Sequence, residues 1–313
     1  MIEAQGLTKD FDGFRAVDTV SLDIPAGEVL ALLGPNGAGK TTTVRMLTSI
    51  LVPTAGWARV AGCDVVRQAA QVRALVGVLT EQHGLYERMK GLEYLDFFGE
   101  IYHLAPALRR KRALDLLERF GLINALDKRL GEYSKGMKQK LALVRAMLHD
   151  PPVLLLDEPT SAMDPQSAKQ VRDAIIELEG EGRTFLLTTH NLTEAQQLAD
   201  KIAVIRHGRI IAQGSFAELA QRFVGAPLME LHINGTVNGL RKDLADVVQI
   251  EDCGADWLRY RASDPARSNP ALLRRLHMLG VEVVTLALVP RTLEDVYLQI
   301  VKEDEAQQGA QDS

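Results

Sequence analysis

Gly34-Pro35-Asn36-Gly37-Ala38-Gly39-Lys40-Thr41-Thr42 is the most informative segment of this sequence. It fits the pattern GxxxxGK[ST], with the apolar run Val29–Leu33 before it and a helical pattern over Thr42–Leu51 after it. Glycines let backbone N–H groups turn toward phosphate oxygens, and the N-terminus of the following helix adds a partial charge of roughly +0.5. The sequence therefore predicts a nucleotide phosphate site, with every residue of the quoted segment in contact with the nucleotide.

Two residues of the loop and two acidic residues further along the chain predict phosphate chemistry. Lys40 can reach the β- and γ-phosphates, and the Thr41 hydroxyl can bind Mg²⁺. The segment Val153–Thr160 (VLLLDEPT) is a buried-strand pattern that ends in two acids. Ligands of open α/β sheets bind at the carboxyl ends of the strands, so Asp157 is predicted to hold Mg²⁺ directly or through water. Glu158 is predicted to orient or deprotonate a water molecule aimed at the γ-phosphate.

Further short apolar runs indicate the fold class. Helical patterns separate these runs, which is typical of a parallel sheet covered by helices on both faces. The expectation is an α/β fold of the P-loop NTPase kind. The runs are Leu75–Leu79, Val153–Leu156, Thr184–Thr188 and Ile202–Ile205.

The pattern changes along the chain and divides it into domains. We expect a nucleotide-binding domain over residues 1–224, with a helical subdomain at about 84–150 that includes the amphipathic stretch Arg109–Phe120. A linker at Gly225–Pro227 precedes a small α+β domain over 225–302. Its predicted order, βαββαβ, is that of a ferredoxin-like domain. The polar, acidic tail 303–313 is expected to be disordered.

Composition excludes several classes of protein. The chain has 313 residues, of which 46% are hydrophobic and 25% charged, as in ordinary soluble globular proteins. The formal charge of -5 argues against a nucleic-acid partner. No run of roughly 18 apolar residues and no signal-peptide pattern occurs. With only two cysteines, Cys63 and Cys253, the sequence predicts a cytoplasmic protein.

Taken together, the motifs resemble those of the ATP-binding cassette (ABC) ATPases. The segment Tyr133–Met137 (YSKGM) matches the family signature LSGGQ at Ser134 and Gly136. Ser161–Asp164 resembles the D-loop, and His190, after the strand pattern TFLLTT, resembles the switch histidine. The motifs occur in the family's order, so the resemblance is specific.

The resemblance implies a site shared between two chains. Ser134 is a good N-cap for a helix over Lys135–Leu148, and the helix N-terminus with the serine hydroxyl can bind an anion. In ABC proteins this site faces the γ-phosphate held by the other protomer, so a head-to-tail dimer, here a homodimer, is expected. Gly136 and Asp164 would contribute across the dimer, and His190 would hydrogen-bond the γ-phosphate.

Two assignments by resemblance keep a neighbouring alternative. Phe11, in the segment KDFDG, is placed against adenine, with Phe14 as the competing aromatic residue. The family glutamine that contacts Mg²⁺ and the attacking water follows a strand. Alignment of the segment GVLTEQ at 77–82 puts Glu81 in this catalytic and metal-binding place, and a shift by one residue would put Gln82 there.

The expected function is ATP hydrolysis (ATP and water to ADP and phosphate) that powers a separate transmembrane permease. The chain would lie on the cytoplasmic face of the membrane by holding this permease, which Gly84–Lys90 is expected to contact. Thr292–Leu298 (TLEDVYL) resembles the closing segment of bacterial multidrug and antibiotic-resistance exporter ATPases. Export of a drug, antibiotic or lipid-like substrate is therefore expected over import.

Two other functions remain as alternatives. One is a soluble ABC ATPase that acts on the ribosome or another macromolecule, although the chain has a single cassette and no long coiled coil. The other is a nucleotide sensor or P-loop kinase, which would need neither the Ser134 motif nor His190.

Overall fold

The computed structural model describes residues 1–80, 84–161, 163–237 and 239–311. Within these residues no helix combines the length and apolar composition that a bilayer span needs. The chain forms two compact units, Met1–Phe216 and Ala217–Ser313, each with its own hydrophobic core. The division falls before most of helix α8 (Phe216–Val224), whereas the expectation from sequence places it after this segment.

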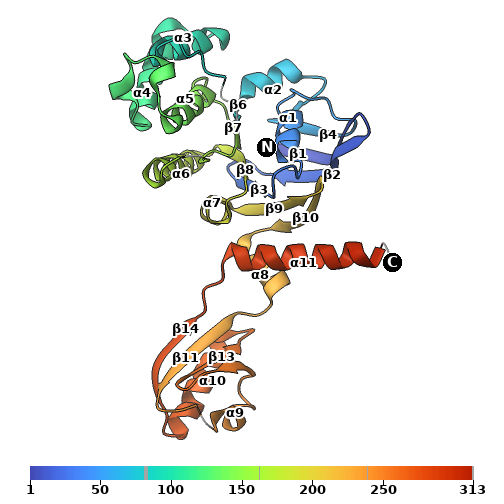
Figure 1. The fold of residues 1–313 in the computed structure, drawn as a ribbon, viewed down its shortest axis with the longest axis vertical. Helices are drawn as coiled ribbons and strands as arrows, with labels where there is room; N and C mark the ends of the chain where they lie inside the picture. The colour runs from blue at the N-terminus through green and yellow to red at the C-terminus, as the bar shows by residue number, and fades with distance from the viewer. Residues whose placement is uncertain (81–83, 162, 238, 312–313) are drawn as a thin grey trace. The chain divides into compact units, whose positions relative to one another are not determined.

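A six-stranded sheet forms the centre of the first unit (Figure 1). Its strands are β3 (Val29–Leu33), β6 (Val76–Leu79), β7 (Val153–Asp157), β8 (Thr184–Thr189), β9 (Lys201–Arg206) and β10 (Arg209–Gly214). Their order is β10-β9-β3-β8-β7-β6, and all neighbours are parallel except β9 and β10. Strands β3, β7 and β8 are buried at every residue, as expected for a parallel sheet that is covered on both faces. The α/β class and the predicted apolar strands are confirmed.

A second, antiparallel sheet in this unit is not predicted from the sequence. It consists of β1 (Ile2–Phe11), β2 (Phe14–Ile24), β4 (Ala55–Val60) and β5 (Cys63–Asp64), in the order β2-β1-β4-β5. Three register shifts interrupt the pairing of β1 with β2. The alternation of apolar residues therefore breaks after Ala4 in β1 and is kept only over residues 19–24 of β2.

Helices complete the first unit. They are α1 (Lys40–Leu47), α2 (Ala69–Leu75), α3 (Gly91–Ile101), α4 (Pro106–Arg119), α5 (Lys135–Met147), α6 (Pro165–Gly180) and α7 (Leu192–Leu198), with short 3-10 turns at Ile123–Ala125 and Leu130–Glu132. Helices α3, α4 and α5 contact one another and form the helical part of the unit. Helix α4 buries Ala113 and Leu117, and Phe120 just beyond it, as the amphipathic pattern predicts.

The second unit contains a four-stranded antiparallel sheet. Its elements after α8 are β11 (Leu228–Asn234), α9 (Leu240–Asp243), β12 (Ile250–Cys253), β13 (Trp257–Arg261), α10 (Pro265–Met278), β14 (Glu282–Leu288) and α11 (Leu293–Gln311). The strand order is β12-β13-β11-β14, so β13 lies between β11 and β12 and splits the first βαβ unit. Leu231, Tyr260 and Leu276 are fully buried in its core.

The predicted disorder of the tail is wrong for the part that the structure describes. Helix α11 continues to Gln311. Glu, Gln, Ala and Lys are good helix formers, and pairs four residues apart add side-chain hydrogen bonds. Gln299 bonds to Glu303, and Gln308 bonds to Asp304. A polar, acidic composition therefore coexists here with helix.

Gly77 on β6 generates a stability prediction. A Cβ atom at this position would meet the Ala146 carbonyl oxygen of α5 at 2.2 Å. Gly77→Ala should therefore destabilise the protein by about 1–3 kcal/mol through overpacking. Gly180→Ala is the matched control, because nothing lies within 4 Å of its Cβ position at the end of α6. We expect the control to raise stability by up to about 1 kcal/mol. Urea unfolding measures both, and equal midpoints would contradict the close approach of α5 to β6.

Candidate active site

The phosphate loop joins β3 to α1, as the sequence predicts. Gly37 and Gly39 have φ of +80° and +104°, a region that residues with a side chain rarely adopt. A Cβ atom on Gly39 would also meet the Ala16 carbonyl oxygen at 2.6 Å. The loop therefore needs glycine here, for its turn and for its close contact with β2. Helix α1 begins at Lys40 and ends at Leu47, so it starts two residues before the expected range Thr42–Leu51 and ends four residues before its end.

Lys40 is buried beneath this loop. Its ammonium donates hydrogen bonds to the carbonyl oxygens of Gly34 at 2.6 Å and Pro35 at 3.2 Å. It also lies 3.7 Å from the Oε1 atom of Glu158. The loop thus surrounds the Lys40 ammonium, and its positive charge lies at the centre of the predicted phosphate site.

Asp157, the last residue of β7, links the acidic strand end to the loop. One of its oxygens accepts a hydrogen bond from the Thr41 hydroxyl at 2.9 Å, and the other accepts one from the Thr188 hydroxyl on β8. Asp157 is almost completely buried. Two of the three predicted Mg²⁺ ligands, Thr41 and Asp157, are therefore in direct contact.

Glu158 lies in an unusual backbone conformation, with φ of +51°. Its N–H donates to the Thr188 carbonyl oxygen at 3.0 Å. Its Oε2 atom lies 2.9 Å from Nδ1 of His190, which directly follows β8. Its Oε1 atom is buried, and no hydrogen-bond donor among the described residues reaches it. The predicted base and switch histidine are thus side by side.

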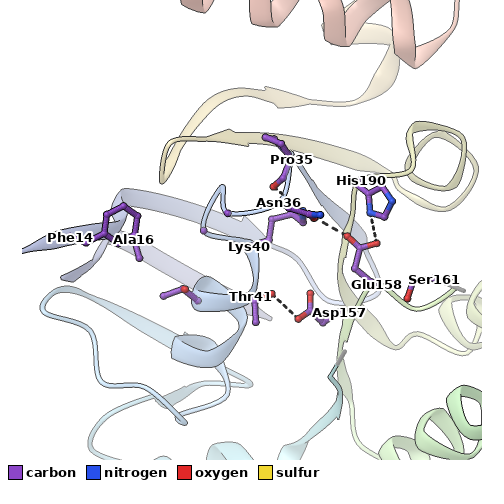
Figure 2. Close-up of a pocket in the computed structure, with 13 residues that line it drawn as sticks. Phe14, Ala16, Pro35, Asn36, Lys40, Thr41, Asp157, Glu158, Ser161 and His190 are labelled. Atoms are coloured by element: carbon purple, nitrogen blue, oxygen red, sulfur yellow. Dashed lines mark hydrogen bonds and ion pairs between the residues drawn. The ribbon is translucent and has the colours of Figure 1, made fainter. Parts of the chain in front are cut away.

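These groups line one pocket of about 510 Å³, which Figure 2 shows. That volume suits a small-molecule ligand. Most of the phosphate loop and the start of α1 form one wall, and Asp157, Glu158, Ser161 and His190 form the other. The lining residues of the loop and helix are Pro35, Asn36, Gly37, Gly39, Lys40, Thr41 and Thr42. Two predicted nucleotide contacts, Gly34 and Ala38, belong to the loop but do not line the pocket.

The aromatic residue on the pocket is Phe14, and Phe11 does not line it. The two phenylalanines are paired across the β1–β2 turn, and both are exposed, at 41% for Phe11 and 64% for Phe14. Strand β2 is the one that runs beside the loop, since Ala16 meets Gly39. Strand β1 lies one strand further away, and the Phe11 ring contacts Lys9 instead. The alternative, Phe14, is therefore the aromatic residue that lines the pocket, and the adenine contact stays a prediction for both residues.

The remaining predicted residues lie away from this pocket or outside the described residues. Ser134 caps α5 by accepting a hydrogen bond from the Met137 N–H at 3.2 Å, which confirms its predicted capping role. Asp164 caps α6 in the same way. Neither they nor Gly136 line the pocket. Glu81 and Gln82 lie outside the described residues.

Two buried residues near the site are not predicted as site residues from the sequence. Gln139 on α5 donates to the carbonyl oxygens of Glu158 and Pro159. Glu194 on α7 accepts hydrogen bonds from Thr160 and Thr189. Burial raises the pKa of the Glu194 carboxyl, the two threonine hydrogen bonds oppose this, and the charge of Glu158 adds to it. One sequence feature could have indicated Gln139 and Glu194: each is a polar residue on a helix face that is otherwise apolar.

Comparisons with known proteins agree with this geometry. The family model described as ABC transporter matches residues 17–161. A daunorubicin/doxorubicin resistance ATP-binding protein of Streptomyces peucetius is 39% identical, over 96% of this chain and 92% of that protein. A Nod factor export ATP-binding protein of Paraburkholderia xenovorans is 36% identical, over 96% of each.

A solved structure of an ATP-binding subunit of an ABC transporter has the same fold as the first unit. Its TM-score is 0.67 at 29% identity, and the match covers 72% of this chain and 94% of that one. The glycine loop, the acidic strand end and the histidine that follows β8 thus occur in a chain whose relatives match nearly end to end. The chain belongs to the ABC transporter family, as one of its ATP-binding, ATP-hydrolysing proteins.

Proposed function

We propose that this ATPase hydrolyses ATP together with Mg²⁺ and thereby powers export through a separate membrane permease. The observation that carries the chemistry is the convergence of Lys40, Asp157, Glu158 and His190 on one pocket from three adjacent strand ends. A cation, a metal-binding carboxylate and a buried carboxylate paired with a histidine are the groups that phosphoryl transfer to water requires.

The residues present fit a magnesium ion. Mg²⁺ prefers hard oxygen ligands and uses few protein groups besides waters and phosphates. The Thr41 hydroxyl and the Asp157 carboxylate, 2.9 Å apart, supply two such oxygens at the edge of the pocket. When bound, the ion would neutralise phosphate charge.

Protein side chains would supply the remaining steps. Lys40, at the centre of the glycine loop, would hold the β- and γ-phosphates by charge-assisted hydrogen bonds. Glu158 has one carboxylate oxygen bonded to His190 and another without a donor among the described residues. That second oxygen is buried 3.7 Å from the Lys40 ammonium, and it would accept a proton from a water molecule once Lys40 binds the phosphates. His190, 60% exposed, would contact the γ-phosphate and report its loss.

A second copy of the chain would complete the site. Ser134 and Gly136 lie at the N-terminus of α5, where backbone N–H groups and the helix dipole favour an anion. They do not line the pocket of their own chain. A head-to-tail homodimer would bring them to the γ-phosphate of the other copy, with Asp164 nearby.

The permease would contact the helical part of the first unit. Tyr86, in the predicted contact segment 84–90, is 51% exposed, and Phe97 on α3 is 42% exposed. Their rings are 5.8 Å apart, in an edge-to-face arrangement. Exposed aromatic pairs of this kind suit a protein contact. The names of the two relatives, for drug resistance and for export, favour an exporter over an ATPase of the ribosome.

Replacement of Glu158 tests the chemistry. Glu158→Gln should bind ATP but hydrolyse it about 10²–10⁴-fold more slowly, because the general base is lost, and should accumulate as a dimer. Lys40→Ala should instead weaken ATP binding by about tenfold or more. Glu177→Gln, a surface carboxylate paired with Arg119, is the matched control. Phosphate release, ATP binding and gel filtration measure these effects. Wild-type turnover by Glu158→Gln would remove Glu158 from the role of base.

The choice between Glu81 and Gln82 can be made by direct comparison. We expect Glu81→Ala to lower the hydrolysis rate by about tenfold or more and to raise the Mg²⁺ concentration needed, because a metal ligand is lost. Gln82→Ala should have the smaller effect. A larger loss for Gln82→Ala in a magnesium titration of ATPase activity would assign the role to Gln82.

Partner capture tests the export proposal. Tagged Glu158→Gln, expressed in its native host and solubilised with ATP in mild detergent, should retain its permease, since slow hydrolysis keeps the dimer closed. Mass spectrometry should then find a stoichiometric membrane protein with several spans. Lys40→Ala is the control and should retain less of it. Ribosomal proteins as the main partner, or no partner, would overturn the transport proposal.

A further inference from the structure

The turn after β7 holds the proposed base in a conformation that needs support. Glu158 has φ of +51°, which costs free energy for a residue with a long side chain and persists only where surrounding contacts enforce it. Two buried polar side chains, Gln139 and Glu194, contact this turn from different helices. Neither lines the nucleotide pocket, so any effect on the reaction must act through the groups that they hold.

Gln139 fixes the backbone of the turn. Its side chain is 3% exposed, and its amide nitrogen donates to the carbonyl oxygens of Glu158 and Pro159, each at 3.0 Å. Two consecutive carbonyl groups are thereby held by one side chain. Gln139 belongs to the first turns of α5, the helix that Ser134 caps. The turn that carries the proposed base is therefore tied to the beginning of α5.

Glu194 ties the same turn to the histidine. Its carboxylate, 2% exposed, accepts from the Thr160 hydroxyl at 2.7 Å and from the Thr189 hydroxyl at 2.6 Å. Thr160 ends the turn, and Thr189 directly precedes His190. One buried carboxylate thus sets the spacing between the two backbone segments whose side chains, Glu158 and His190, lie 2.9 Å apart.

We propose that Gln139 and Glu194 are positioning residues that together hold Glu158 against His190, and that Gln139 makes the position of Glu158 depend on α5. The second part rests on the proposed function, in which the start of α5 meets the phosphate held by a second copy. If that contact displaced α5, Gln139 would move with the helix. Its two hydrogen bonds would then move Glu158 of the same chain. Each chain would then adjust its own base in response to its partner's nucleotide.

Kinetic measurements on the full-length protein test the proposal. Gln139→Leu removes both hydrogen bonds at similar volume and should lower kcat by about 10–100-fold, with KM for ATP changed less than about twofold. Gln170→Ala is the matched control and should keep wild-type kcat. It removes the glutamine that accepts a hydrogen bond from Lys140, the neighbour of Gln139 on α5, and it does not contact the turn. An equal loss in the control would overturn the assignment of Gln139.

Conservative replacement separates positioning by Glu194 from simple packing. Glu194→Gln can still bond both threonine hydroxyls, because each hydroxyl can donate or accept. It should retain kcat within about threefold, while Glu194→Ala should lose about 10–100-fold. Where Glu194→Ala does not fold, Thr160→Val breaks the link to the turn alone and should lower kcat without changing KM. Equal activities of the alanine, valine and wild-type proteins would overturn the role of Glu194.

NMR spectroscopy tests the positioning of Glu158 without a measurement of ATP turnover. NMR signals of the His190 ring should shift in Gln139→Leu and in Thr160→Val, because Glu158 moves relative to the ring. The ring of His149, stacked on Tyr102 at 3.8 Å, is the internal reference and should not shift. Unchanged His190 signals in both variants would overturn the proposal. Absence of ATP turnover in the wild-type protein would instead overturn the proposed function. The NMR comparison would still test whether Gln139 and Glu194 position Glu158, because it does not depend on turnover.

Discussion

The parallel pairing of β3, β8 and β7 is the constraint on which the site depends. Strand β8 lies between the other two, with Leu33 paired to Thr189 and Asp157 paired to Thr188. Because parallel strands end at the same edge of a sheet, this register fixes where three separate segments begin. The phosphate loop, the Asp157–Glu158 pair and His190 all start within one residue of that edge. A shift in register would separate Lys40 from the Asp157–Glu158 pair, and Glu158 from His190, although each motif would still be present in the sequence.

Charge balance at this edge explains why the strands must be held so closely. Lys40, Asp157 and Glu194 are each at least nine-tenths buried, and an unpaired buried charge costs several kcal/mol. Carbonyl groups of the loop surround Lys40, and threonine hydroxyls bond to both carboxylates. Threonine hydroxyls neutralise no charge, so the carboxylates keep their capacity to attract a cation. For Glu194 the two threonine hydrogen bonds oppose the effect of burial, but burial outweighs them and raises the pKa of its carboxyl.

The sequence predicts the parts of this molecule that depend on local pattern. The apolar strands, the glycine loop and the Ser134 cap each need a particular residue at a particular spacing, and all are found. Local pattern does not determine contacts between distant segments. Phe11 and Phe14 are equivalent by pattern, and only the position of β2 beside Gly39 distinguishes them. Gln139 and Glu194 are single polar residues on helices, and their role follows from where α5 and α7 pack.

Two of the predicted nucleotide contacts, Ser134 and Gly136, do not line the pocket of their own chain. Within one chain, the phosphate loop and the residues after β7 and β8 line the pocket. Ser134 and Gly136 lie at the start of α5, away from it. A chain that carried all of its anion-binding groups in its own pocket could hydrolyse ATP alone and would perform no work. In the proposed dimer, an anion-binding group on α5, together with the two hydrogen bonds from Gln139 to the Glu158 turn, would make hydrolysis depend on a second copy. Approach and separation of the two copies would then be steps of the proposed cycle, and a permease could use these movements.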